Sequence, residues 1–264
     1  MAKTFNNAYP VVVALAGQAG AGKTSTADAI CPPGHMFEGH IFWDHLWHVI
    51  PLYEFATARL KIEGVDETNR QLYQIHNIAS ELLSGSVGYY DLIDTVTELH
   101  TLPIDTSGRK PRTFLQIAGD ICRSKDKDCF PKWIKKKVYQ NWGDMQHLEP
   151  IQMEDAFHIT LVSDTRYLNE LEYLKTYPNT LTIKLHASTE VRMARLQARD
   201  GWTITEDQAN HISELDVPKP EFDELIDLHL ETDDLTPDEQ VQAVKNIIYE
   251  FLPEYAKERV QLNG

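Results

Sequence analysis

A glycine-rich turn between two regular elements constrains the fold of this chain most strongly. Residues 17–24 read Gly-Gln-Ala-Gly-Ala-Gly-Lys-Thr. The continuous apolar run 11–16 before the turn predicts a buried parallel strand. The segment 24–30 after the turn predicts a helix that ends before Pro32. A strand, a glycine-rich loop and a helix in this order are typical of α/β proteins.

The turn matches the P-loop pattern G-x-x-x-x-G-K-[ST], whose residue types suit phosphate binding. Glycines let the backbone N–H groups approach phosphate oxygens, Lys23 can reach the β- and γ-phosphates, and the Thr24 hydroxyl can bind Mg²⁺. The alternative is a glycine-rich turn with a chance Lys-Thr pair. We expect ATP and Mg²⁺ as cofactors. The expected ATP-binding residues are Gly17, Gln18, Ala19, Gly20, Ala21, Gly22, Lys23, Thr24 and Ser25.

Composition limits the class of protein. The chain has 264 residues, of which 42% are hydrophobic and 25% charged, as expected for one globular α/β domain. It has neither an apolar stretch as long as a membrane span nor an N-terminal signal peptide, so we expect no membrane partner. Its three cysteines lack metal-ligand spacing, and their odd number argues against a disulfide framework. We therefore expect a cytoplasmic protein with reduced thiols.

The net charge of −15 makes nucleic acid an unfavourable partner over most of the surface. Six lysines nevertheless lie between Lys125 and Lys137. They form either a solvated helix face or a wall that attracts an anionic substrate. The sequence leaves a monomer and a homodimer both open.

Strands that alternate with helices predict a central parallel sheet with helices on both faces. The expected strands are 11–16, 40–42, 157–164, 181–185 and 225–230. The expected helices are 24–30, 44–59, 112–123, 131–141, 167–175, 191–199 and 236–251. We expect one domain over 1–264, with a helical insertion at about 50–110 and a lid at about 190–215. Breaks in the insertion are expected at Gly64, Ser84-Gly85 and Thr106-Ser107-Gly108.

Asp164 ends the apolar run 157–164, where ligands of open α/β sheets bind. Its carboxylate could hold Mg²⁺ through water or orient an acceptor molecule. The alternative is a cap for the helix expected from residue 167. Three further polar residues follow it: Arg166, Asn169 and Glu170.

Arginines gather on two predicted helices. Arg112 and Gln116 share one helix face by their spacing, and Arg123 falls on nearly the same side. Two guanidinium groups on one face suit the capture of a phosphate, and ion pairs with Asp120 or Asp126 are the alternative.

A second helix carries Arg192, Arg195 and Arg199 at i, i+3 and i+7. A mobile lid that closes these arginines over transferring phosphates is one interpretation. In the alternative interpretation, Glu190 and Asp200 pair with these arginines and neutralise part of their charge.

Several segments resemble, in the same order, the deoxynucleoside monophosphate kinases of tailed phages and their bacterial relatives. These segments are Gly17–Asp28, Phe42-Trp43-Asp44-His45-Leu46, Arg112–Arg123, Asp126–Trp133, Val162–Glu170, the arginines at 192, 195 and 199, and His211–Glu214 followed by Asp223. The resemblance covers most of the chain outside 50–110 and the C-terminal tail. It implies the three-layer P-loop nucleotide-kinase fold and the reaction ATP + dNMP → ADP + dNDP.

The resemblance also implies roles for single residues. Lys23 and Thr24 would serve ATP and Mg²⁺, with Asp164 as the second metal residue. The implied catalytic residues are Lys23, Arg166, Arg192, Arg195 and Arg199. The implied substrate-binding residues are Asp44, Arg112, Gln116, Arg123, Asp164, Arg166, Asn169 and Glu170.

The chain departs from this family at Asp44-His45-Leu46-Trp47, where members often carry Asp-Pro-Leu-Lys. A basic residue near the substrate is then missing unless His45 or His48 replaces it. The acceptor therefore stays open, and a kinase of hydroxymethylated pyrimidine in phage DNA, or of another small metabolite, is an alternative. A P-loop ATPase, a GTPase or a nucleotide-binding module is a further class, although Asn-Lys-x-Asp, which a GTPase needs for guanine, is absent from the sequence.

Overall fold

The computed structural model describes residues 9–32, 34–38, 41–62, 64, 66–104, 111–145, 157–200 and 215–252. The chain divides into two compact units. The first, called the sheet unit here, consists of Met1–Trp47, Ile134–Arg195 and Ile212–Gly264. The second, called the helical unit, consists of His48–Trp133 and Leu196–His211. The expected insertion falls within the helical unit, and residues 201–214 of the expected lid lie outside the described residues.

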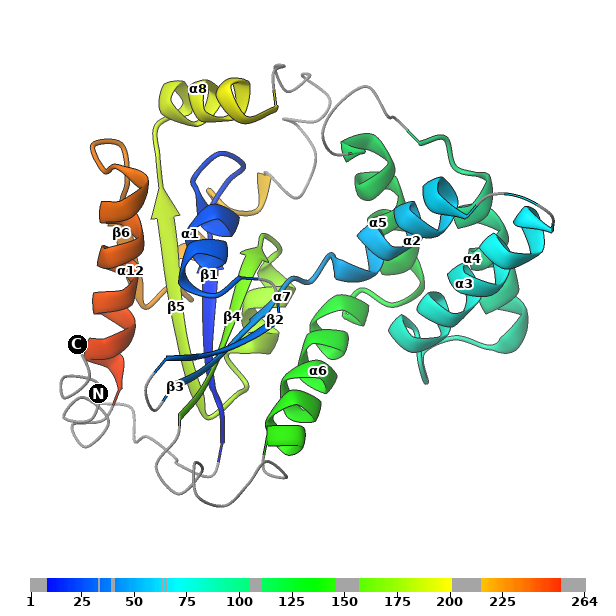
Figure 1. Cartoon of the computed structure of the whole chain (residues 1–264), viewed down its shortest axis with the longest axis horizontal. Coiled ribbons are helices and arrows are strands. Elements are labelled where there is room, and N and C mark those ends of the chain that lie inside the picture. The colour runs from blue at the N-terminus through cyan, green and yellow to red at the C-terminus, as the bar shows by residue number, and fades with distance from the viewer. Residues whose placement is uncertain are drawn as a thin grey trace. The chain divides into compact units, whose positions relative to one another are not determined.

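The sheet unit contains a six-stranded sheet in the order β2-β3-β4-β1-β5-β6 (Figure 1). Its strands are β1 (Val11–Ala16), β2 (Gly34–Glu38), β3 (Ile41–Leu46), β4 (Phe157–Thr165), β5 (Asn179–His186) and β6 (Leu228–Glu231). The strands from β3 to β6 in this order are parallel, which confirms the expected parallel sheet. β2 is an addition that the sequence did not predict, and it pairs antiparallel with β3.

The start predicted for the helix at 44–59 was wrong. Residues 44–46 belong to β3, and the helix that follows, α2, spans Ile50–Lys61 with a proline in its first turn. All six residues of β3 are buried. A strand that is buried on both faces lacks the alternation of polar and apolar residues, so its pattern resembles that of a buried helix.

Helices cover both faces of the sheet, as expected. α1 (Lys23–Ile30) and α12 (Pro237–Phe251) pack on the face to which Val13 and Leu15 of β1 contribute. Ala16 contributes to the other core, with Leu171 of α7 (Leu168–Leu174) and Phe222 of α11 (Pro220–Asp223). Since successive strand residues point to opposite faces, these two cores lie on opposite sides of the sheet.

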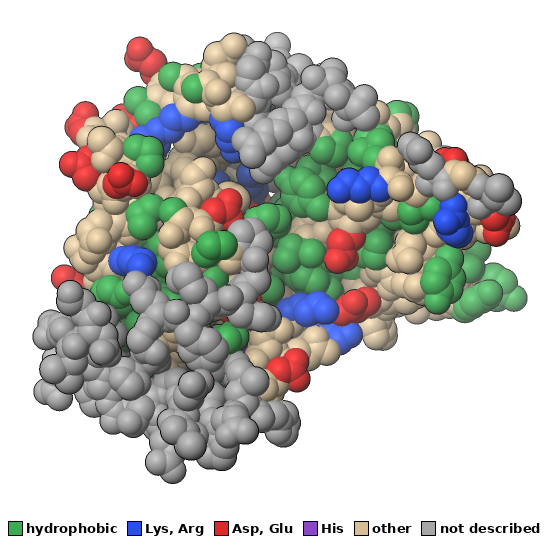
Figure 2. Space-filling model, viewed as in Figure 1, with side chains coloured by type: hydrophobic (Ala, Val, Ile, Leu, Met, Phe, Trp, Pro, Cys, Tyr) green, Lys and Arg blue, Asp and Glu red, His purple; other side chains and the backbone are tan. Residues whose placement is uncertain are grey.

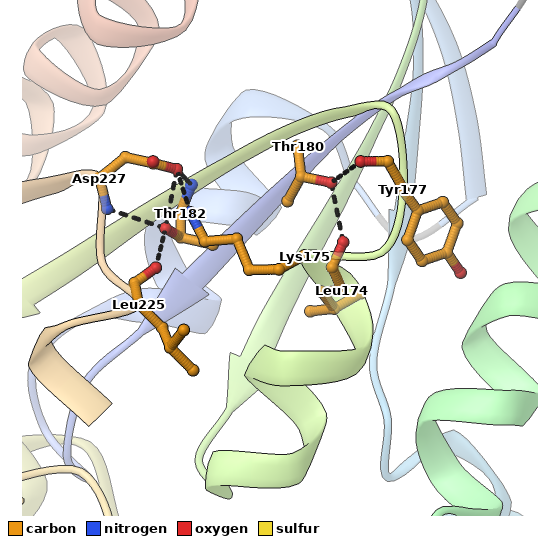
Figure 3. A network of polar contacts seen from close by, with 7 residues as sticks. All are labelled: Leu174, Lys175, Tyr177, Thr180, Thr182, Leu225 and Asp227. Atoms are coloured by element: carbon orange, nitrogen blue, oxygen red, sulfur yellow. Dashed lines mark hydrogen bonds and ion pairs between the residues drawn. The ribbon is translucent and has the colours of Figure 1, made fainter. Parts of the chain in front are cut away.

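A polar network ties β5 to the segments on either side of it in the chain (Figure 3). Asp227 Oδ2 accepts from Lys175 Nζ at 2.7 Å and from the backbone N–H of Thr182 at 2.9 Å. Burial by itself raises the pKa of Asp227, but the hydrogen bonds from Lys175 and Thr182 outweigh it and hold that pKa below its ordinary value. The network thus joins the end of α7, the middle of β5 and the start of β6 through a charged carboxylate.

The helical unit contains α2, α3 (Glu67–Leu82), α4 (Tyr89–Thr101), α5 (Arg112–Lys125), the first turn of α6 (Cys129–Met145) and the end of α8 (Thr189–Asp200). The guanidinium of Arg59 donates to the carbonyl oxygens of Leu99 at 3.2 Å and Leu102 at 2.8 Å. These bonds satisfy carbonyls at the end of α4 and hold α2 against it. The described residues of the segment 60–110 are mostly helical, as expected, and the breaks at Gly64 and Ser84-Gly85 are confirmed, whereas the break at 106–108 lies outside the described residues.

Hydrophobic side chains also reach the surface of the helical unit, as the green atoms over its helices show in Figure 2. The large exposed hydrophobic residues of this unit are Leu60, Tyr73, Tyr89, Tyr90, Ile93 and Ile117. The rings of Tyr89 and Tyr90 contact each other edge to face at a centroid distance of 5.6 Å.

Candidate phosphate-binding site

The glycine-rich loop leaves the carboxyl end of β1 and runs directly into α1 (Figure 1). Gly17, Gly20 and Gly22 have φ angles of 138°, 86° and 91°. Only glycine adopts such angles without strain. The backbone N–H of Ala21 donates to the carbonyl of Gln18 at 3.2 Å and closes the turn. Gly22 precedes α1 and provides no side-chain cap, and the start of a helix is a position where backbone N–H groups can bind an anion.

Neighbouring elements require the same glycines. A Cβ at Gly17 would clash with the carbonyl oxygen of Leu185 in β5. A Cβ at Gly20 would lie 2.6 Å from the carbonyl oxygen of Arg192, and one at Gly22 would lie 2.5 Å from Nε2 of Gln240. The loop is therefore packed closely against three distant segments of the sheet unit.

Lys23 places a buried cation in this loop. Its side chain is 4% exposed, and Nζ donates to the carbonyl oxygens of Gly17 at 2.5 Å and Gln18 at 2.9 Å. The ammonium group thus lies beside the positive end of the α1 dipole, and the two together favour an anion. Thr24 is half-buried and Ser25 exposed in the first turn of the same helix.

The strand order places a second set of polar residues beside the loop. β1 and β4 are neighbours, and the chain leaves them in opposite directions, toward β3 after β1 and toward β5 after β4. Ligands of open α/β sheets bind at such a switch point. Ala16 pairs in register with Thr165, so Asp164, near the end of β4, and Arg166, directly after it, lie at the edge of the sheet where the loop begins. Asp164 is 9% exposed, and Arg166 is half-buried.

Glu170, a residue expected to bind substrate, takes part in the N-terminal cap of α7. Its side chain is 1% exposed, and Oε2 accepts from the backbone N–H groups of Arg166 at 3.0 Å and Tyr167 at 3.2 Å. This is the capping role that the sequence offered as the alternative for Asp164. Asn169 is half-buried in the first turn of the same helix.

The arginines expected in a lid lie on α8 (Thr189–Asp200). Arg192 donates from Nη1 to the carbonyl oxygen of Ala19 at 3.2 Å, so it contacts the glycine-rich loop itself. Arg195 donates to the carbonyl oxygen and the hydroxyl of Thr232 at 2.5 and 3.1 Å. Arg199 is exposed. Arg192 and Arg195 thus bond to protein oxygens here, which the spacing along the helix did not indicate.

Asp44, expected near a nucleoside, is 1% exposed within β3. Its Oδ2 accepts from Asn141 Nδ2 at 2.6 Å and lies 3.9 Å from His158 Nε2. These contacts join β3 to α6 and β4.

His45 is a buried polar group that sequence reasoning considered only as a replacement for a missing basic residue. Its Nε2 accepts from Trp47 Nε1 at 2.7 Å and lies 2.8 Å from Ser163 Oγ. Because the indole is only a donor, the proton of the neutral ring resides on Nδ1, which lies 3.3 Å from Asp28 Oδ1. Burial lowers the pKa of His45 below its ordinary value, although Asp28 and Asp164 oppose that change. A neutral His45 therefore links α1, β3 and β4.

The remaining expected substrate residues lie on α5 of the helical unit, where the helix is confirmed. Arg112, Gln116 and Arg123 are all half-buried. The Arg123 guanidinium lies over Gly119, whose Cβ would come within 2.7 Å of Nη1, and its Cζ lies 4.5 Å from the ring centroid of Phe130. The contact with the aromatic ring favours this position of the cation.

Two lysines of the cluster between Lys125 and Lys137 contact other side chains of the protein. Asp126 accepts from Lys132 Nζ at 2.8 Å. Lys135 Nζ lies 5.6 Å from the ring centroid of Tyr173 and 5.8 Å from that of Tyr177. Lys132 and Lys135 thus have partners within the protein.

The residues beside the loop fit a nucleotide-bound magnesium ion. Thr24 and Asp164 supply hard oxygen donors, and Mg²⁺ in such sites takes most of its other ligands from phosphates and water. Within the described ranges, no group of three or more His, Cys, Asp and Glu side chains is arranged to hold a metal.

Fold and site together define an α/β protein with a helix-flanked parallel sheet and a glycine-rich loop at its switch point. Neither a protein-family model nor a curated protein matches the chain. Over the part of the chain that the structure describes, no helix is both long and apolar enough to cross a membrane.

Proposed function

We propose that this protein is a P-loop kinase that transfers the γ-phosphoryl group of ATP to a deoxynucleoside monophosphate. One observation carries the proposal. The loop Gly17–Thr24 has the conformation, the buried Lys23 and the uncapped helix start that a polyphosphate requires, and it lies at the switch point of a parallel sheet. The resemblance of the sequence to deoxynucleoside monophosphate kinases names the acceptor.

In the proposed reaction, an acceptor phosphate oxygen attacks the γ-phosphorus in line. A bond forms between that oxygen and the phosphorus, and the bond to the β,γ-bridging oxygen breaks, which gives dNDP and ADP. The attacking oxygen is already anionic, so the protein needs no strong general base. Catalysis then depends on holding two polyanions together and neutralising their charge.

The chain's own residues supply this neutralisation. Lys23 would exchange its bonds to the carbonyls of Gly17 and Gln18 for bonds to the β- and γ-phosphates. Thr24 and Asp164 would hold Mg²⁺, directly and through water, and the ion would neutralise charge that develops on the phosphates. Arg166, at the carboxyl end of β4, is the acceptor-phosphate residue proposed within the sheet unit.

The resemblance further assigns Arg112, Gln116 and Arg123 of the helical unit to the acceptor. The planar guanidinium of Arg123, which lies against the ring of Phe130, suits bidentate phosphate binding. Arg199 is the lid arginine whose side chain is exposed on α8. The reaction would take place in the cytoplasm, where ATP and free nucleotides are available.

The test measures ADP and dNDP formation with ATP and Mg²⁺ against a panel of dNMPs, NMPs and duplex DNA, with a reaction that lacks acceptor. We expect dNDP with one or more dNMPs, and loss of activity in Lys23→Ala. No diphosphate formation with any monophosphate would refute the proposal, and phosphoryl transfer to DNA alone would identify the DNA-directed kinase instead. ADP release that needs no acceptor would identify an ATPase.

A further inference from the structure

The C-terminal helix α12 reaches back to the glycine-rich loop through one buried glutamine. Gln240 is 4% exposed, and its Nε2 donates to the carbonyl oxygen of Ala21 at 3.3 Å and to the hydroxyl of Thr26 at 2.7 Å. Ala21 and Gln240 are separated by 219 positions in the chain. Both hydrogens of this side-chain amide are therefore used to join α12 to the loop and to α1.

Gln240 also packs directly on Gly22. A Cβ at Gly22 would lie 2.5 Å from Nε2 and 3.1 Å from Oε1 of Gln240. Gly22 thus meets two requirements, because it has a φ of 91° and leaves room for this amide. The glutamine is consequently held in contact with the last peptide unit before α1.

That contact sets the direction of a backbone donor. In a trans peptide the C=O and the following N–H point in opposite directions, and the structure contains no cis peptide bond among the described residues. When Gln240 draws the carbonyl of Ala21 toward α12, the N–H of Gly22 is directed away from α12. Arg192 acts in the same way on the carbonyl of Ala19, and therefore on the N–H of Gly20.

We propose that Gln240 is a positioning residue of the phosphate-binding loop, which holds the Ala21–Gly22 peptide so that the N–H of Gly22 faces the phosphates of ATP. Gln240 itself does not touch the ligand. The role assigned to ATP rests on the proposed function, whereas the ordering of the peptide is a property of the protein without nucleotide.

Two substitutions separate this role from simple packing. Gln240→Met keeps the length of the side chain and removes both donors. Gln240→Glu keeps the shape but turns an acceptor toward the carbonyl of Ala21. Gln242 provides the matched control, because it is exposed on the same helix and bonds only to Asn246 among the contacts described.

The first measurement is amide hydrogen exchange by NMR in the protein without nucleotide. In both Gln240 variants we expect exchange to rise about tenfold at Ala21 and Thr26, whose N–H groups donate to the carbonyls of Gln18 and Gly22, with unchanged exchange in β4 and β5. The corresponding variants Gln242→Met and Gln242→Glu should stay within twofold of the wild type. Unchanged exchange at the loop would overturn the proposal, and so would an increase spread over the whole sheet unit, which indicates a packing role only.

The second measurement is the dissociation constant of MgATP by calorimetry. We expect it to rise about tenfold in Gln240→Met and further in Gln240→Glu. MgATP affinity within twofold of the wild type in both folded variants would also overturn the proposal. A wild-type protein that binds no ATP would instead refute the proposed function, and the exchange experiment would still decide whether Gln240 orders the loop.

Discussion

The replacement Gly20→Ala tests whether the loop is as closely packed as the structure indicates. Gly20 has a φ of 86°, a conformation that costs a non-glycine residue about 1–2 kcal/mol. The new Cβ would also lie 2.6 Å from the carbonyl oxygen and 2.9 Å from Cβ of Arg192. Relief of such overlap by backbone movement costs about 1–3 kcal/mol. We therefore expect Gly20→Ala to lower the free energy of unfolding by about 2–5 kcal/mol.

Gly85 provides a control for the backbone term alone. It has a φ of 76°, and a Cβ there would have no other heavy atom within 4 Å. Gly85→Ala should therefore lower the free energy of unfolding by about 1–2 kcal/mol, from the backbone conformation only. The difference between the two variants measures the contact between the loop and α8.

Urea unfolding followed by far-UV circular dichroism and tryptophan fluorescence gives both free energies. MgATP calorimetry on the folded variants adds a functional readout, and only Gly20→Ala should weaken binding. Equal losses of stability in the two variants would refute the reasoning, because the contact with Arg192 would then have no measurable cost.

Three further predictions concern the polar contacts of the sheet unit. Asp227→Asn should lower the free energy of unfolding in urea at pH 7 by about 1–3 kcal/mol, since Lys175 loses its charged partner. Because the folded pKa of Asp227 lies below the ordinary 3.8, the wild type gains this stability above pH 3.8 and loses it as the pH falls through the folded pKa. A variant with the same acid sensitivity as the wild type would contradict the assignment. The pKa of His45 is lowered from 6.5, so its contribution to stability is complete above pH 6.5 and is lost on acidification. The urea midpoint of the wild type should therefore decrease as the pH is lowered from 8 to 5, and it should decrease less in His45→Gln. An equal pH dependence of the two midpoints would argue against a buried neutral ring. Glu170→Ala should lower the free energy of unfolding by about 0.5–2 kcal/mol, and Glu170→Gln should lower it less, because an amide oxygen can still accept from the N–H groups at the start of α7. Equal losses of stability in urea unfolding would contradict the cap.

Local patterns were sufficient for much of the fold. The apolar run 11–16, the glycines after it and the helix at 24–30 appear as predicted, because each depends on residues close together in the chain. The predicted helices of residues 60–104 and 112–123 are likewise confirmed. Their polar and apolar residues alternate with the helical period, which a helix on a surface preserves.

The errors occurred where burial removed that alternation. β3 is buried along its whole length, so nothing in its pattern distinguished it from the start of the helix expected at 44–59. β2 follows two prolines and begins at Gly34, a composition typical of a turn, and it forms a strand by pairing with β3.

In the candidate site, too, the sequence predicted some residues and missed others. Lys23, Thr24 and the loop glycines are consecutive, and Asp164 and Arg166 were found from the end of an apolar run. The sequence did not show that Glu170 caps a helix or that Arg192 contacts Ala19, because both depend on the geometry around the loop. Gln240 had no sequence signal at all, since one glutamine on an amphipathic helix is ordinary.

By itself, the sequence determined the glycine-rich loop, its flanking strand and helix, and the charge that the loop carries in Lys23. Only the tertiary structure decided which distant side chains hold that loop, because Ala19 and Ala21 meet residues 173 and 219 positions away. The strand order brings those segments together, and strand order arises from packing of the whole sheet rather than from any local pattern.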